Sequence, residues 1–155
     1  RAEPEKAIST LDPAALHAQF ALNAIGPALA LKHFAPLLPR RAPGRVAALS
    51  ARVGSIGDNR LGGWHGYRAA KSARNQLFHG AAIELKRSRP QLSVALLHPG
   101  TVESDLSRPF RPEGADRPEI FTPEESAEQL LSVLNGVTPD KSGGFWDYAG
   151  RSIEW

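Results

Sequence analysis

A tyrosine and a lysine, Tyr67 and Lys71, stand four residues apart in a segment with helical periodicity. Side chains at this spacing project from the same face of a helix. A tyrosine with a pKa near 10 is a poor acid or base at neutral pH, but a cation within about 4–6 Å favours its phenolate and lowers that pKa. The pair could therefore carry out general acid–base chemistry. Taken alone, the same spacing is more often a core tyrosine followed by a solvated lysine.

Other nucleophiles and metal ligands are poorly represented. Gly54-Ser55-Ile56-Gly57 is not the G-x-S-x-G elbow of serine hydrolases, and no histidine follows it in a suitable context. The absence of cysteine excludes disulfides, thiolate zinc sites and a cysteine nucleophile. The five histidines are scattered, with no pair at ligand spacing on a helix, so no metal site is expected.

Composition indicates an ordinary globular protein with no membrane or nucleic-acid partner. The 155 residues suffice for one domain, and 41% are apolar and 23% charged. No apolar run approaches the ~20 residues of a bilayer span, and no signal peptide is visible, so a cytoplasmic location is expected. Basic residues bunch at predicted helix ends without interleaved aromatic residues, which argues against nucleic-acid binding. Because the sequence contains no methionine, we expect that Arg1 is not the native N-terminus.

The elements that must position Tyr67 and Lys71 alternate between helices and strands. Helices are predicted over 13–39, 65–87 and 123–135, and short buried strands over 45–50, 92–97 and 145–148. Asp12 is a suitable N-cap for the first helix, and Thr122 opens a capping box for the third. Pro27 lacks an N–H, so the helix should open there and leave the Asn23 carbonyl free for water.

Helical periodicity also predicts which side chains face inward. For the first helix these are Leu16, Phe20, Asn23, Pro27, Leu31 and Phe34, and for the second Tyr67, Ala70, Leu77, Ala81 and Leu85. Apolar strands separated by amphipathic helices indicate an α/β protein whose parallel sheet carries helices on both faces. Ligands of such sheets bind beyond the carboxyl ends of the strands, here from Ser50 and from Leu97 onward.

Four motifs, in order, resemble those of the short-chain dehydrogenase/reductase family, and most closely its C-factor-like branch of bacterial carbonyl reductases. They are the N-x-x-G motif at Asn23 to Gly26, the active-site stretch from Leu49 to Lys71, the P-G motif at His98 to Val102, and the tail from Gly143 to Tyr148. The resemblance covers essentially the whole chain. It implies that residues 1–155 are the C-terminal catalytic part of a single domain with a Rossmann-type doubly wound parallel sheet. No glycine-rich phosphate turn occurs in the sequence, so we expect the N-terminal dinucleotide-binding segment to lie outside this chain.

The resemblance also implies an activity, the NAD(P)H-dependent reduction of an aldehyde or ketone or the oxidation of the matching alcohol. Tyr67 would be the general acid, and Lys71 would lower its pKa and bind the nicotinamide ribose. Asn23 would hold a water of the proton relay on its carbonyl. The substrate-orienting serine departs from the family pattern because its usual place is Ala51. Ser55, twelve residues before Tyr67, is preferred to Ser50, and both remain open.

The remaining predictions concern the cofactor, the substrate and the assembly. By resemblance, the cofactor is NADP or NAD, with NADP favoured, and its contacts are Tyr67, Lys71, Pro99, Gly100, Thr101, Val102 and Ser104. Residues 103–121 would form a substrate loop, in which Phe110, together with Trp64, either lines the pocket or covers local core. Arg52 and Asp58 would fix a loop. A homodimer or homotetramer is expected, with the alanine-rich face of residues 69–82 as the candidate surface. The alternative is a non-catalytic signalling or interaction protein on the same scaffold.

Overall fold

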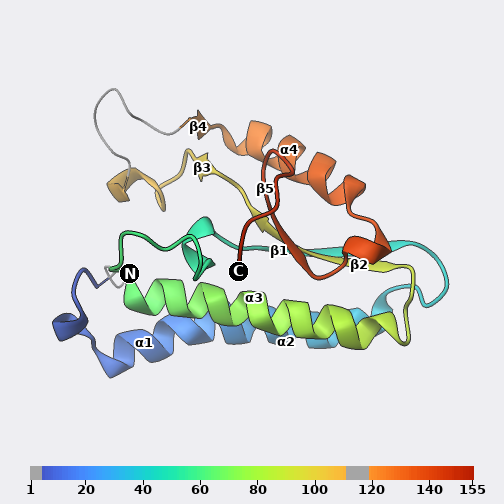
Figure 1. Ribbon diagram of the computed structural model, residues 1–155, viewed down its shortest axis with the longest axis horizontal. Coiled ribbons are helices and arrows are strands. Elements are labelled where there is room, and N and C mark those ends of the chain that lie inside the picture. Colours follow the sequence, from blue (N-terminus) through green and yellow to red (C-terminus); the bar gives the residue numbers. More distant parts are fainter. Residues whose placement is uncertain (1–4, 111–118) are drawn as a thin grey trace.

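A computed structural model describes residues 5–110 and 119–155, which form a parallel sheet between two layers of helices (Figure 1). The sheet contains β1 (Gly44–Leu49), β2 (Leu92–His98) and β5 (Gly144–Asp147) in the order β1-β2-β5. Helices α1 (Pro13–Phe20), α2 (Gly26–Phe34) and α3 (His65–Lys86) lie on one side, and α4 (Pro123–Gly136) lies on the other. The predicted α/β class, with a parallel sheet and helices on both faces, is confirmed.

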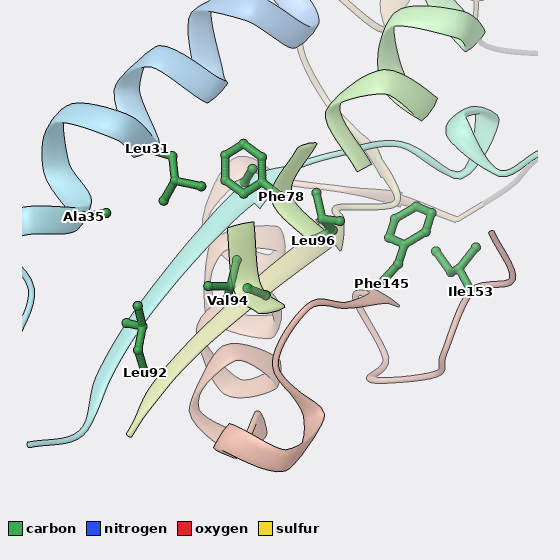
Figure 2. Close-up of a cluster of buried hydrophobic side chains, with 10 residues drawn as sticks. Leu31, Ala35, Phe78, Leu92, Val94, Leu96, Phe145 and Ile153 are labelled. Carbon is green, nitrogen blue, oxygen red and sulfur yellow. The ribbon is translucent and has the colours of Figure 1, made fainter. Parts of the chain in front are cut away.

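The central strand β2 divides the core in two. Its side chains alternate between faces, as the two-residue repeat of a strand requires. Leu92, Val94 and Leu96 pack with Phe78 of α3 and with side chains of α2 (Figure 2). Two of the intervening residues of β2, Ala95 and Leu97, point to the α4 side of the sheet. There they form a second cluster with Val137 and partly buried neighbours. Since all of β2 except His98 is buried, this strand anchors everything that follows it at its carboxyl end.

The first predicted helix is interrupted as Pro27 requires. A π-helical turn, Ala21–Ile25, separates α1 from α2, and a 3₁₀ turn, Ala35–Leu37, ends the segment. The Asp12 side chain accepts from the Ala15 N–H at 2.7 Å, which confirms the predicted cap. Within the wide turn, the Gly26 N–H bonds to the Ala21 carbonyl five residues back. The opening expected at Asn23 is therefore present, although the carbonyl is not free for water, as described below.

Two predicted inward positions are wrong. Phe34 of α2 is 62% exposed and Leu77 of α3 is 46% exposed. On α3 the buried stripe instead runs at four-residue intervals through Gly66, Ala70, Arg74, Phe78 and Ala82. Ala70 and Ala82 are thus buried in this chain's own core, so the alanine-rich face of 69–82 is not available as a whole for contact with another copy.

One stretch departs from the expectation that no apolar run could span a bilayer. Pro13–Leu37 is a run of 25 helical residues, counting its π-helical and 3₁₀ turns, that passes as long and apolar enough to cross a membrane; its mean hydropathy is 1.3 over an 18-residue window. Length and composition alone do not separate such a span from a helix of a globular core. Here the stretch packs along α3 through α1, the wide turn and α2, and its buried members are Ala24, Leu31 and Ala35.

A second, small sheet was not predicted. Strands β3 (Thr101–Val102) and β4 (Ile120–Phe121) pair in parallel. Two-residue strands carry too short a pattern to be seen in the sequence. They close the base of the predicted substrate loop 103–121, of which residues 111–118 lie outside the described part of the chain.

Candidate active site

The candidate site lies at the carboxyl ends of the three parallel strands, where the sequence predicted it. β1 ends at Leu49, β2 at His98 and β5 at Asp147, and α3 crosses beside them. Helix α3 begins at His65, after Trp64 in the left-handed conformation with φ of 52°. This sharp entry brings the first turns of α3, with Tyr67 and Lys71, next to the 3₁₀ turn Arg52–Gly54 that follows β1.

Tyr67 and Lys71 share a face of α3, as predicted. The Lys71 Nζ lies 5.4 Å from the centre of the Tyr67 ring. The lysine is buried, and its Nζ donates to the Leu49 carbonyl at 3.4 Å. A Cβ at Gly54 would lie 2.8 Å from the Lys71 Cβ, so only a glycine allows the loop to approach the lysine this closely.

Burial, more than the charge of the lysine, sets the pKa values of this pair. It raises the pKa of Tyr67 above 10.0, and Arg74 opposes that rise. Burial and, as the smaller cause, the neighbouring Arg74 together lower the pKa of Lys71 to about 7. The expectation that Lys71 brings the pKa of Tyr67 down toward neutrality is therefore wrong for these surroundings. The lysine is itself close to half-neutral at pH 7, and desolvation of the phenol outweighs the nearby positive charge.

Asn23 lies on the opened helical turn, which contacts α3, and its carbonyl is occupied. That carbonyl accepts from Nε of Arg74, and the Asn23 Oδ1 accepts from the same guanidinium at 3.3 Å. The Asn23 amide donates to Gln19 at 2.8 Å. The prediction that this carbonyl is left for water is corrected by Arg74, which the sequence reasoning missed. The available signal was an arginine on the buried four-residue stripe of α3.

The two candidate serines differ in what their hydroxyls already do. The Ser50 Oγ donates to Asn75 Oδ1 at 2.6 Å in a buried contact. The Ser55 Oγ accepts from the Asp58 N–H at 3.0 Å, and no described residue accepts a hydrogen bond from it. A hydroxyl has one proton to donate. The Ser50 proton is already used in the bond to Asn75, whereas the Ser55 proton remains available for a ligand.

The loop between β1 and α3 is fastened by charges, as expected for Arg52 and Asp58. Arg52 lies 3.4 Å from Asp58 and 3.2 Å from Asp147, whose carboxylate is fully buried and also accepts from Arg151 at 2.9 Å. Beside this cluster, the Nδ1 of His98 is buried and has no hydrogen-bond partner among the described residues. Burial and the neighbouring Arg52 lower the pKa of His98 to about 4, so this ring is neutral at physiological pH. Asp147 and His98 were not predicted as site residues.

The segment predicted to meet the cofactor follows β2 in a sharp turn. Gly100 has a φ of 74°, and a Cβ there would lie 2.8 Å from the Phe121 ring. The Pro99 carbonyl accepts from the Ser126 hydroxyl, while Thr101 and Val102 form β3. Ser104 is engaged in its own turn, where its Oγ accepts from the Ser107 N–H at 3.2 Å.

Of the two predicted pocket aromatics, only Trp64 can be placed. Its ring stands edge-on to Tyr67, with centroids 6.4 Å apart. The side chain of Phe110 lies outside the described part of the chain. Among residues 5–110 and 119–155, no group of three or more His, Cys, Asp or Glu side chains could hold a metal ion.

The donor groups at this edge suit a hydroxyl-rich ligand. An ammonium carries three N–H donors, and among the described residues only the Leu49 carbonyl accepts one from Lys71. The remaining donors of Lys71 fit the ribose of a nicotinamide nucleotide, and the turn at Gly100 brings backbone groups to the same edge. The residues present therefore fit the nicotinamide half of such a cofactor.

Comparison with known proteins decides the family. Residues 2–115 match the short chain dehydrogenase family. The chain belongs to this family. It is 34% identical over 148 residues to 1-hydroxy-2-glutathionyl-2-methyl-3-butene dehydrogenase of Rhodococcus sp. strain AD45, a match covering 96% of this chain and 62% of that protein. It is also 34% identical over 150 residues to C-signal of Myxococcus xanthus, which covers 96% of this chain and 84% of that protein.

Solved structures agree on the fold. The carbonyl reductase Sniffer of D. melanogaster superposes over 100% of this chain with a TM-score of 0.83, at 24% identity and 63% of its own length. A short-chain dehydrogenase/reductase of Burkholderia multivorans, with bound NADP, superposes over 99% with a TM-score of 0.78, at 27% identity and 61% of its length. The chain thus spans less than two thirds of the length of several of the family members that it matches.

Proposed function

We propose that this chain carries the proton-transfer half of an NAD(P)H-dependent oxidoreductase that reduces an aldehyde or ketone, or oxidises the matching alcohol. The observation that carries the proposal is the pairing of Tyr67 and Lys71 on one buried face of α3, at the carboxyl ends of the sheet. Membership of the short chain dehydrogenase family supports a catalytic role for the pair. Lys71 and Ser55 also have hydrogen-bond donors that could contact a cofactor or substrate.

In this mechanism the bound nicotinamide supplies the hydride, and the chain handles the proton. Because burial keeps the pKa of Tyr67 high, the phenol is protonated at neutral pH and is ready to donate to the oxygen of the reduced carbonyl. Ser55 would hold that oxygen with its unspent hydroxyl proton. Lys71 would bind the ribose hydroxyls and orient the ring beside Tyr67.

The cofactor we propose is NADP in preference to NAD. Two similar structures, the Burkholderia multivorans protein and a carbonyl reductase from chicken fatty liver, are described with bound NADP and NADPH respectively. The backbone contacts would come from Pro99, Gly100, Thr101 and Val102, and Ser104 would lie at the margin of the site.

Replacement of Tyr67 by phenylalanine tests this function. In the full-length protein, Tyr67→Phe should lower turnover of a panel of aldehydes and ketones by about 10²–10⁴-fold, because the proton donor is lost while the ring remains. Cofactor oxidation in the presence of each carbonyl compound measures this. Tyr148→Phe is the matched control, since this is the other tyrosine of the sequence and its ring packs on Phe121. Equal activity of the Tyr67 variant and the parent chain would refute the assignment.

A second candidate, a non-catalytic signalling or interaction protein, is favoured by the likeness to C-signal, of which the chain covers 84%. Titration of the full-length protein with NADPH and NADH, followed by the fluorescence of the reduced nicotinamide, separates the two. Binding of either dinucleotide in the micromolar range or tighter supports the oxidoreductase. Absence of binding by both supports the signalling alternative.

A further inference from the structure

Arg74 is a buried arginine that joins three parts of the candidate site. It is 6% exposed and lies on the stripe of α3 that faces the core. Its guanidinium donates to the carbonyl and to the side-chain oxygen of Asn23, and to the carbonyl of Leu49 at the end of β1. One side chain therefore ties the opened helical turn to the strand end, across α3.

Arg74 also brings a second cation to the lysine. The Leu49 carbonyl that accepts from Arg74 accepts from Lys71 as well, at 3.4 Å. Among the described residues, neither cation forms an ion pair with a carboxylate. Burial of a charge without a counter-charge is costly, and here only carbonyl and amide oxygens compensate the guanidinium. An apolar side chain would pack on this stripe at lower cost, as Phe78 does one turn later. Packing alone therefore does not explain an arginine at this position.

We propose that Arg74 is a positioning residue of the proton-transfer site. It holds Asn23 against the end of β1, and its fixed positive charge biases Lys71 toward the neutral amine and Tyr67 toward ionisation. The proposal rests on the function proposed above for Tyr67 and Lys71. In this role the Arg74 side chain donates to the Asn23 carbonyl, which the π-helical turn would otherwise leave open to solvent.

The electrostatic setting agrees with this arrangement. Arg74 is the neighbouring charge that lowers the pKa of both Tyr67 and Lys71, opposing burial in the first and reinforcing it in the second. The guanidinium stays charged across the working range of any enzyme, so its effect on Lys71 is constant with pH.

The test measures the titration of Lys71 directly, without turnover. The full-length protein carrying ¹³C-labelled lysine is titrated by NMR, and Lys71 is identified as the signal missing from a Lys71→Met variant. With Arg74→Gln, which keeps hydrogen-bonding groups but removes the charge, the midpoint should rise from about 7 by about one pH unit or more. With Arg74→Lys, which restores the charge, it should return to within a few tenths of the parent value.

Arg89 provides a matched control. It is 7% exposed and donates to two backbone carbonyls, those of Pro36 and Leu38, at the far end of α3. Arg89→Gln therefore removes an equally buried charge and should leave the Lys71 midpoint unchanged. An unshifted midpoint in Arg74→Gln, or an equal shift in Arg89→Gln, overturns the proposal.

The pH profile of turnover separates this proposal from the proposed function. If the parent chain turns over carbonyl compounds, loss of the Arg74 charge should displace the limb of the profile that reports Lys71 in the same direction as the NMR midpoint. If the parent chain shows no turnover, a shifted midpoint still supports the role of Arg74, and only the enzymatic function falls. If turnover is present and the Lys71 midpoint does not move in Arg74→Gln, the proposed function is supported and the role of Arg74 is refuted.

Discussion

At the scale of single residues, the site is dominated by the cost of burying charge. Lys71 and Arg74 lie side by side on α3, and burial is the main cause of the lowered pKa of each. Tyr67 is held protonated by the same desolvation. At neutral pH the phenol of Tyr67 is therefore protonated, and the lysine is the group that titrates there.

The lowered pKa of Lys71 predicts a pH-dependent stability. The folded pKa is about 7 against 10.5 unfolded, so between these values the unfolded chain binds more protons. The free energy of unfolding should then rise with pH, by about 2 kcal/mol over about two pH units above the folded pKa. Urea unfolding of the full-length protein across this range measures it.

Two variants show whether Lys71 is the source of this dependence. Lys71→Met should remove the rise, because no amine then differs in pKa between the folded and unfolded chain. Lys86→Met, at the exposed end of α3, should retain it. A parent chain whose stability is flat with pH over this interval would contradict the assignment.

At the scale of elements, short segments with strong local chemistry form as the sequence predicts. The capping box is complete, since Thr122 Oγ1 accepts from the Glu125 N–H at 3.2 Å and the Glu125 carboxylate accepts from the Thr122 N–H at 2.8 Å. The turn after β2 also forms from neighbouring residues, Pro99 and Gly100. How much it contributes to the free energy of unfolding depends on the side chains that pack against it. At Gly100 both the backbone and the neighbouring Phe121 ring exclude a side chain.

Alanine substitutions at two glycines should therefore have opposite effects. Gly100→Ala should lower the free energy of unfolding by about 1–3 kcal/mol, because a positive φ strains any Cβ and Phe121 must move. Gly80→Ala should raise it by about 0.5–1 kcal/mol, because Gly80 lies within α3 with open space where its Cβ would be. Denaturant unfolding of both variants is the measurement. A neutral Gly100→Ala would show that this turn is not held as described.

At the scale of the whole molecule, the sheet leaves one edge bare. β1 is at the edge in the order β1-β2-β5, and Leu49 at its end is 56% exposed. A largely apolar groove runs beside this strand. Its lining includes Pro27, Leu31, Phe34, Val46, Leu49 and Phe78, together with the charged Arg74. The other edge is partly closed by the tail, where Ser152 bridges Trp146 of β5. The chain also spans only 62% of the Rhodococcus relative.

This edge predicts the behaviour of the 155-residue polypeptide on its own. An unpaired apolar strand invites association, so we expect it to aggregate or to melt without a sharp transition. Light scattering after size-exclusion chromatography and a thermal melt followed by circular dichroism measure both properties. Arg45 lies on β1 with its side chain exposed, and Arg45→Val should worsen the association by removing a charge from the edge. A monodisperse monomer with a cooperative melt would contradict the prediction.

The sequence by itself determined the properties that depend on neighbouring residues. Short apolar runs bounded by turns predict the strands and helical periodicity predicts the helices. The missing N–H of Pro27 predicts the opened turn, and helical spacing places Tyr67 and Lys71 on one face. Only the tertiary structure decided what each buried group meets. Arg74 donates to the Asn23 carbonyl that was predicted to be free, and Phe78 is buried in the core where Leu77 was expected. The pKa of Tyr67 is raised, whereas a lowered pKa was expected. The reason is physical: dihedral preferences and periodicity are local, whereas desolvation and electric field come from segments far apart in the chain.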